Sequence, residues 1–254
     1  MGKLIRDLQR RKARDRRGLI LAEGHRLVED ALDAGAHVVA LLVADDAAQA
    51  EGAGRLIALA EGRKADIEIV PRPAFDDLAD TGTPSGMLAI VAWEPLALDQ
   101  LPAPAPGALA LVLDAVQDPG NAGTMIRTAH ALGAWCTVAL DGTADVRGPK
   151  VVRGAMGSHF RHPVAEADWD GFAAWATRQD MAILVAAADG VPAGSVRRSA
   201  GASVLVVGSE GQGVRDGWSG LEHRRIAIPM PGDAESLNAA VAAGILLYEL
   251  LRVR

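Results

Sequence analysis

Residues 118–127 read DPGNAGTMIR and follow closely on an apolar run at residues 108–113. An apolar run that gives way to Pro, Gly and Asn and then to a helical pattern is typical of the strand-to-helix turns of α/β proteins. Such turns are where α/β folds gather ligand-binding backbone. The stretch therefore predicts a buried strand, a turn and a helix that carries Arg127.

Two later stretches have the same character. Residues 207–213 read VGSEGQG at the end of one apolar run, and residues 228–238 read IPMPGDAESLN at the end of another. Further continuous apolar runs lie at residues 135–140 and 181–186. Continuous runs are typical of strands in a parallel sheet that is covered on both faces. We therefore expect an α/β domain with a parallel sheet in this part of the chain.

A proline-rich segment precedes that domain. Residues 94–107 read EPLALDQLPAPAPG, and four prolines in this stretch cannot continue a helix or lie inside a sheet. We interpret residues 95–107 as an interdomain linker. Before it, apolar runs alternate with helical patterns; the runs are residues 19–22, 38–43, 67–70 and 87–93. The predicted domains are a small α/β domain at residues 1–94 and a larger α/β domain at residues 108–254.

The charge distribution leaves a nucleic-acid partner open. The 254 residues carry a formal net charge of −6, which argues against binding phosphate, because nucleic-acid-binding proteins usually have a basic footprint. Residues 1–17, however, hold eight basic and two acidic side chains, a local balance of +6. Such an arm can contact a polyanion, and the alternative is a solvated first helix.

Several classes of protein are excluded or disfavoured. No apolar run reaches membrane-spanning length, and the first residues lack the apolar core of a secretory signal, so we expect no membrane association and a cytoplasmic location. The single cysteine, Cys136, excludes an intrachain disulfide and a cysteine-rich metal site. His159 and His162 have no carboxylate at metal-ligand spacing, and we predict no metal.

The three loop stretches also have plain structural interpretations. Asn121 and Ser236 are each suited to cap the helix that follows them. Residues 211–213 supply only a Gly-x-Gly, and Asp216 stands where a dinucleotide fingerprint needs its third glycine. Ser209 is not spaced as the nucleophile of a hydrolase elbow. A nucleotide-dependent enzyme of unrelated chemistry is therefore disfavoured.

The last segment predicts an interface. Residues 236–251 are apolar on almost every side of a helix, so the helix must be buried on almost every side. A domain of this size supplies one covering surface, and a second copy of the chain supplies the other most simply. We therefore expect a two-fold homodimer.

The order and spacing of the three stretches resemble the signature motifs of the SpoU (TrmH-type) family of RNA ribose 2′-O-methyltransferases, in the SPOUT superfamily. Residues 149–157, PKVVRGAMG, resemble the family's Pro-Lys-x-x-Arg-x-Ser-x-Gly segment, with Ala155 where many relatives have Ser. Residues 11–32 look like the family's amino-terminal substrate-binding domain. The resemblance implies a carboxy-terminal SPOUT domain with a parallel sheet and a trefoil knot, in a homodimer whose partner subunit contributes to each site.

The resemblance also implies roles for individual residues. The residues implied to bind S-adenosylmethionine are Gly208, Glu210, Gly211, Ile228, Met230 and Leu237. The implied catalytic residues are Arg127, Asn121, Glu210, Ser236 and Asn238. The implied RNA contacts are Arg11, Arg14, Arg16, Arg17, Lys150 and Arg153, of which the last two can equally be ordinary surface charges.

The function implied is methylation of a ribose 2′-hydroxyl in RNA with S-adenosylmethionine as the methyl donor, most simply in 23S ribosomal RNA. An arginine is a poor base, since its pKa in water exceeds about 12. We therefore expect Arg127 to act as an electrostatic anchor for phosphate and for the reacting oxygen. The alternatives are a transfer RNA 2′-O-methyltransferase and a non-catalytic RNA-binding or ribosome-assembly protein on the same scaffold.

Overall fold

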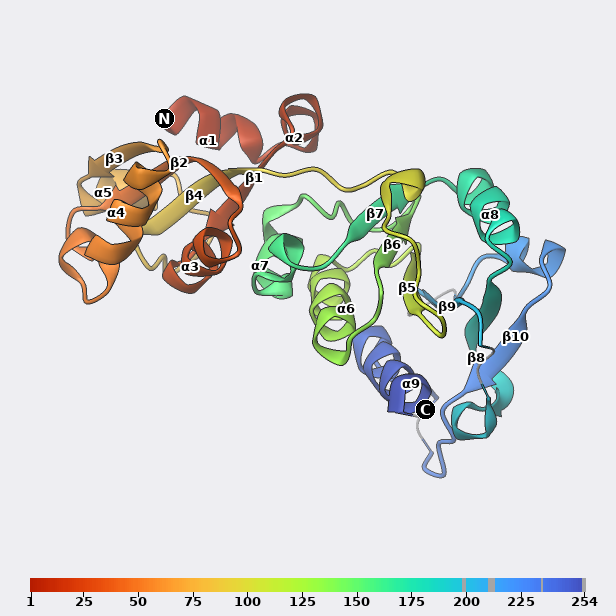
Figure 1. Cartoon of the computed structure of the whole chain (residues 1–254). Coiled ribbons are helices and arrows are strands. Elements are labelled where there is room, and N and C mark those ends of the chain that lie inside the picture. Colours follow the sequence, from red (N-terminus) through yellow and green to blue (C-terminus); the bar gives the residue numbers. More distant parts are fainter. Residues whose placement is uncertain (198–199, 210–212, 234, 253–254) are drawn as a thin grey trace. The chain divides into compact units, whose positions relative to one another are not determined.

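The computed structural model describes residues 1–197, 200–209, 213–233 and 235–252. The chain forms two compact units (Figure 1). One unit comprises Met1–Glu94 and Arg147–Arg161, and the other comprises Pro95–Val146 and His162–Arg254. Each unit is described by itself below.

The first unit is a four-stranded mixed sheet with helices. Its strands are β1 (Leu19–Glu23), β2 (His37–Ala44), β3 (Asp66–Val70) and β4 (Met87–Ala92), in the order β1-β4-β2-β3. Only the β2–β3 pair is parallel. Its helices are α1 (Gly2–Leu8), α2 (Arg11–Arg17), α3 (His25–Asp33), α4 (Ala53–Gly62), α5 (Arg72–Asp76) and α7 (Pro149–Ala155). The predicted alternation of strands and helices before the proline-rich segment is confirmed.

The second unit contains a six-stranded parallel sheet. Its strands are β5 (Leu109–Asp114), β6 (Thr137–Leu140), β7 (Val164–Ala167), β8 (Ala182–Pro192), β9 (Ser203–Gly208) and β10 (Arg224–Ala227), in the order β10-β8-β9-β5-β6-β7. Every neighbouring pair is parallel. Helix α8 (Trp169–Arg178) lies on one side of this sheet, and α6 (Pro119–Leu132) and α9 (Ala239–Arg252) lie on the other (Figure 1). The parallel sheet covered on both faces is as predicted.

Alternate residues of the central strands explain this covering. Val112 of β5 and Val206 of β9 pack with Phe172 and Trp175 of α8 in one cluster of buried side chains. Cys136 belongs to the same cluster, and burial raises the pKa of its thiol above the ordinary value. The thiol is therefore protonated at neutral pH and acts as a small buried hydrophobe.

Two segments group differently from the sequence-based boundaries. Residues 95–107 belong to the second unit, where the backbone of Leu96 bonds to Val164 and Glu166 beside β7. Residues 147–161 belong to the first unit, because α7 packs against β1 and Val152 is part of the core of that unit. Local sequence patterns carry no information about such distant contacts.

No helix in the described part of the chain is long and apolar enough to span a lipid bilayer.

Candidate active site

The sheet brings the first two signature stretches together at one edge. Asp114, the last residue of β5, is the register partner of Gly208, the last residue of β9. The strand of the third stretch, β10, lies two places from β9 in the same parallel sheet. The carboxyl ends of parallel strands share one edge, which is where open α/β sheets bind ligands.

A pocket of about 170 Å³ lies at this edge of the second unit. Five of the residues singled out from the sequence line it: Gly208, Ile228, Met230, Ser236 and Leu237. Asn121, Arg127 and Asn238 are not among its lining residues. Glu210 and Gly211 lie outside the described residues. The second and third signature stretches therefore share one pocket.

Gly208 has to be a glycine for steric reasons. A Cβ atom at this position would lie 2.1 Å from the carbonyl oxygen of Gly213 and 2.4 Å from the amide nitrogen of Val214. The backbones of Ser209 and Gly213 bond to each other in both directions, at 3.0 and 2.9 Å. After β9 the chain turns back, so that Gly213 and Val214 pack against the end of that strand. A side chain at Gly208 would push these two segments of backbone apart.

One wall of the pocket consists of residues to which the sequence motifs assigned no function. Ala186, Ala187 and Ala188 of β8 line it, beside Val207 and Ile226. The apolar run at residues 181–186 did indicate a strand that ends at this edge, but alanines carry no chemical signal. Their small side chains leave the strand backbone close to the pocket.

The first and third signature stretches are joined by a side-chain hydrogen bond. The Nδ2 group of Asn238 donates to Oδ1 of Asn121 at 3.1 Å. The Oδ1 atom of Asn238 accepts from the amides of Ala240 and Val241, at 3.0 and 3.2 Å. Asn238 therefore caps α9 and holds Asn121 at the same time.

This arrangement corrects both predicted helix caps. Helix α6 begins at Pro119, and its cap is Asp118, whose Oδ1 accepts from the amide of Asn121 at 2.8 Å. Asn121 therefore lies inside the first turn. Helix α9 begins at Ala239, and Asn238 takes the capping position predicted for Ser236. Asp, Asn and Ser are all good capping residues, and each loop contains more than one of them within a few residues. Residue type alone therefore did not identify the cap.

Arg127 is an exposed cation on α6. It forms no hydrogen bond or ion pair with any residue in the described part of the chain. An arginine without an acidic neighbour keeps its guanidinium available for an external anion, and the guanidinium fork matches the geometry of phosphate. Helix α6 thus offers a cation six residues after Asn121.

Two of the predicted RNA contacts, Arg14 and Arg153, are buried or half-buried against partners inside the first unit. Arg14 is only 5% exposed, and its Nη1 donates to the carbonyls of Leu8 and Gln9, at 2.8 and 2.9 Å, where α1 ends. Arg14 therefore stabilises the junction of α1 and α2 and does not offer its guanidinium to RNA, which corrects that prediction. Arg153 pairs with Asp80 at 2.8 Å, as an ordinary charge would.

The other predicted RNA contacts are exposed, and three of them form ion pairs at the surface: Arg16 and Arg17 with Asp7, and Arg11 with Asp15. Arg11, Arg16 and Arg17 lie on α2, and Lys150 lies in the first turn of α7. Arg147, just before α7, pairs with Asp15 of α2 at 3.3 Å, so the two helices are neighbours in the first unit. We call the exposed side chains of these two helices the basic surface of the first unit; its members are Arg11, Arg16, Arg17 and Lys150.

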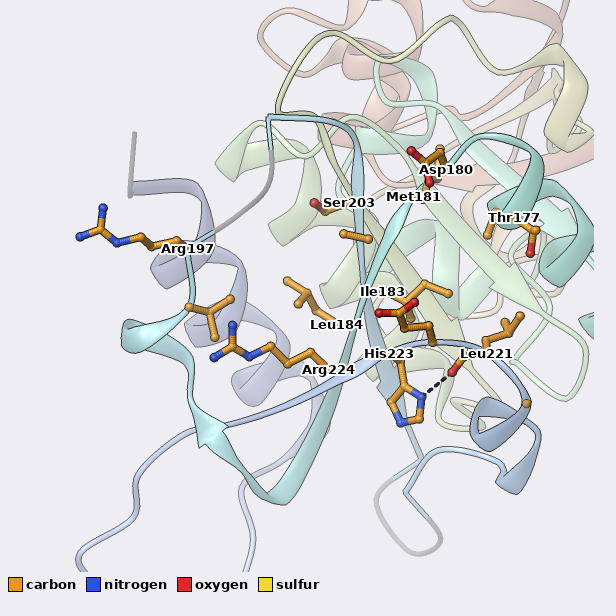
Figure 2. A pocket seen from close by; sticks show the side chains of 15 residues that line it. Thr177, Asp180, Met181, Ile183, Leu184, Arg197, Ser203, Leu221, His223 and Arg224 are labelled. Atoms are coloured by element: carbon orange, nitrogen blue, oxygen red, sulfur yellow. Dashed lines mark hydrogen bonds between the residues drawn. The ribbon is translucent and has the colours of Figure 1, made fainter.

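A second hollow, of about 690 Å³, lies elsewhere in the second unit (Figure 2). It is lined at the amino ends of the strands, by Ala182 of β8, Ser203 of β9 and Arg224 of β10, and by no residue of the three stretches. Its cations Arg197 and Arg224 are balanced by Asp180 and Glu222. We therefore take the smaller pocket, at the carboxyl ends, as the candidate site.

The two histidines serve as packing groups. His159 meets the ring of Trp93 edge-on in the first unit, with centroids 4.8 Å apart. His162 bonds through Nε2 to Oγ1 of Thr137 in the second unit, at 2.9 Å. The described residues contain no group of three His, Cys, Asp or Glu side chains that could hold a metal ion.

Comparison with known proteins gives the family context. A model of the SpoU rRNA methylase family matches residues 108–248, and a model of the MRM3-like substrate binding domain matches residues 3–89. The 23S rRNA (guanosine(2553)-2′-O)-methyltransferase RlmP of Bacillus subtilis is 34% identical over 246 residues, which cover 96% of this chain and 92% of that protein.

Two solved structures are similar over almost the whole chain. An AdoMet-bound rRNA methyltransferase from Sinorhizobium meliloti superposes with a TM-score of 0.88 and is 30% identical, covering 99% of this chain and 94% of that one. The SpoU methyltransferase AviRb from Streptomyces viridochromogenes, in complex with AdoMet, has a TM-score of 0.85 and is 27% identical, covering 99% and 97%.

Proposed function

This chain belongs to the SpoU rRNA methylase family, and from that premise we propose that its pocket holds S-adenosylmethionine for methylation of a ribose 2′-oxygen in 23S ribosomal RNA. The chain is an RNA ribose 2′-O-methyltransferase. One observation carries the assignment of the site: Gly208, Ile228, Met230, Ser236 and Leu237, from two separate signature stretches, line one pocket at the carboxyl edge of the sheet.

The residues that line the pocket suit the base of this methyl donor. Ile226, Ile228 and Leu237 give it apolar walls, which fit a flat, uncharged base. Gly208 and the alanines of β8 have small side chains or none, so a ligand in the pocket can approach the backbone there. S-adenosylmethionine, when bound, supplies an electrophilic methyl group on a positively charged sulfur. Glu210 and Gly211 are kept in the proposed cofactor site by resemblance alone.

Arg127 is proposed to anchor the substrate. A ribose hydroxyl is a poor nucleophile, so the protein has to hold its oxygen in position and lower the cost of losing its proton, a contribution of roughly 10²- to 10⁴-fold. A permanently charged guanidinium pairs with the neighbouring phosphate and stabilises negative charge on the oxygen. The proton then passes to that phosphate or to water.

Asn238 is proposed to align Asn121 with the rest of the site, and Asn238→Asp separates this role from helix capping. The variant keeps the oxygen that caps α9 but replaces the Nδ2 donor with an oxygen that repels Oδ1 of Asn121. Loss of one hydrogen bond corresponds to about a tenfold fall in kcat. We expect that fall in a single-turnover assay, with a melting temperature equal to or above that of the unchanged protein, because a negative charge favours the helix start. An unchanged kcat would remove Asn238 from the catalytic set.

The basic surface of the first unit is proposed to bind the RNA backbone. Lys150→Gln removes one exposed charge from it, so the slope of log affinity against log salt should become shallower by about 0.7 to 0.9. Filter binding of an rRNA fragment at several salt concentrations measures this slope. Lys64→Gln, an exposed lysine just after α4, is the matched control and should leave the slope unchanged. Equal slopes for Lys150→Gln and the unchanged protein would exclude Lys150 from the interface.

A homodimer through α9 is part of the proposal. Val241, Ile245 and Tyr248 are 51%, 38% and 56% exposed and recur at the spacing of one helix face. A row of exposed apolar side chains on one helix is typical of a subunit interface. Ile245→Glu should therefore yield a monomer of about half the native mass by light scattering, since the two-fold axis brings the charge into an apolar contact.

The control for that experiment is Ile69→Glu, which places the same charge on an exposed isoleucine of β3 and should leave the mass unchanged. A native mass for Ile245→Glu would refute the α9 interface. The trefoil knot implied by the family also stays a proposal, as does a cytoplasmic location.

The proposed substrate is tested with labelled methyl donor. Purified protein is incubated with unmodified 23S rRNA and, separately, with bulk transfer RNA, and the label is mapped by resistance of the 2′-O-methylated linkage to alkali. Label in 23S rRNA supports the proposal, and label in transfer RNA alone selects the transfer RNA alternative. Absence of label in both, with RNA binding retained, selects the non-catalytic RNA-binding alternative.

A further inference from the structure

Asp114 is a fully buried carboxylate at the end of β5. Its Oδ2 accepts from the backbone amide of Arg215 and from Nε1 of Trp218, both at 2.8 Å. Its Oδ1 accepts from Nε of Arg215 at 2.5 Å. A buried charge requires this degree of compensation, because it has lost its hydration.

Arg215 contacts a second strand end at the same time. Its Nη1 lies 3.0 Å from Oδ1 of Asp141, and its Nη2 donates to the carbonyl of Asp141 at 2.8 Å. Asp141 directly follows β6, the neighbour of β5. Burial works to lower the pKa of Arg215, but the hydrogen bonds that its guanidinium donates to Asp114 and Asp141 outweigh burial and raise the pKa above its ordinary value. The guanidinium is thus a permanent charge that joins two strand ends.

This arginine lies two residues after the second signature stretch. The chain leaves the sheet at Gly208, closes on itself between Ser209 and Gly213, and reaches Arg215 two residues later. Gly208 is the register partner of Asp114. The loop beside the pocket is therefore fastened at its outgoing end by β9 and at its returning end by the bond from Arg215 to Asp114.

Asp114 is also where the first signature stretch departs. The next residue, Ala115, has a φ of +55°, a left-handed conformation that a residue with a Cβ atom adopts only when its surroundings enforce it. Oγ1 of Thr143 donates to the carbonyl of Leu113 at 2.9 Å, and the amide of Ala144 donates to Val116 at 2.9 Å. The anchored Asp114 and these bonds set the direction of the chain toward α6.

We propose that Arg215 is a positioning residue for methyl transfer: through Asp114 and Asp141 it fixes the loop of the cofactor pocket to the ends of β5 and β6, and the helix of Arg127 departs from the end of β5. This inference rests on the proposed function, because it concerns the same site. Arg215 does not line the pocket; it keeps the pocket and the substrate anchor at a constant separation.

The test variant is Arg215→Lys, which keeps the charge but lacks the fork that reaches both aspartates. We expect the Kd for S-adenosylmethionine, measured by calorimetry, to rise about tenfold and kcat to fall about tenfold, with the KM for RNA unchanged. The melting temperature should fall by only a few degrees. A positioning role requires that the Kd for S-adenosylmethionine and kcat change while the KM for RNA does not. A purely structural role predicts that Kd, kcat and KM all worsen together and that lowering the temperature restores them. Arg178→Lys is the matched control, since Arg178 pairs with Asp99 in an exposed bridge of the same unit and should change none of these values.

The inference is overturned if Arg215→Lys is folded and binds and turns over like the unchanged protein. If that variant does not fold, Asp114→Asn replaces it under the same criteria, because asparagine keeps the volume and one acceptor oxygen. Loss of the fold in both variants would show a structural role only and would also overturn the inference. Calorimetry needs no RNA, so a wrong RNA substrate leaves the Kd result interpretable; a protein without affinity for S-adenosylmethionine would instead overturn the proposed function.

Discussion

Replacing Arg127 with alanine is expected to lower the rate of methyl transfer by about 10²- to 10³-fold while the affinity for S-adenosylmethionine stays within about twofold of the unchanged protein. The reason is the position of the side chain. Arg127 is exposed on α6, does not line the cofactor pocket, and has no acidic partner in the described part of the chain. Its loss removes a charge that acts on the substrate and leaves the pocket intact.

Single-turnover methylation and calorimetry with S-adenosylmethionine measure the two quantities separately. Arg127→Lys should retain part of the rate, because a lysine supplies the charge but not the fork that fits phosphate. If Arg127→Ala lost cofactor affinity and rate to the same extent, the side chain would belong to the cofactor pocket and the division of roles would be wrong.

The second large effect is expected at Gly208. A Cβ atom in Gly208→Ala would lie 2.1 Å from the carbonyl oxygen of Gly213, a backbone atom that cannot move without displacing the loop. We expect the affinity for S-adenosylmethionine to fall at least about 100-fold, and the free energy of unfolding to fall by about 1 to 3 kcal/mol through overpacking. Calorimetry and thermal denaturation measure these effects.

Gly220→Ala provides the control for this variant. A Cβ atom at Gly220 would have no neighbour within 4 Å, and the residue lies in the same unit away from the cofactor pocket. Its cofactor affinity should match that of the unchanged protein. Normal affinity in Gly208→Ala would mean that the loop does not depend on this close approach and that the ligand site lies elsewhere.

The strands were predictable because a strand that is buried on both faces is apolar at nearly every position. Strands β5 and β9 are buried on both faces, and each appears as an uninterrupted apolar run. The loops that follow them were predictable because close backbone approach selects glycine, as at Gly208. Each loop follows the carboxyl end of a strand, and these ends share one edge in a parallel sheet, so the loops could be expected at that edge.

The remaining features depend on contacts that no local pattern records. The Asn238 cap was missed because Ser236 is an equally good capping residue by type. Arg14 looked like part of a solvated basic run, but it folds back onto the carbonyls of Leu8 and Gln9. The pair of Asp114 and Arg215 joins residues 101 positions apart in the chain, a separation at which charge pairing cannot be inferred from one sequence.

The most direct test of this account is a crystal structure of the protein grown with S-adenosylmethionine. We predict density for the adenosine against Gly208, Ile228 and Leu237 in the pocket at the carboxyl ends of the strands. Density instead in the larger hollow at the amino ends, beside Ser203 and Arg224, or no density in either place at a saturating concentration, would contradict the central claim.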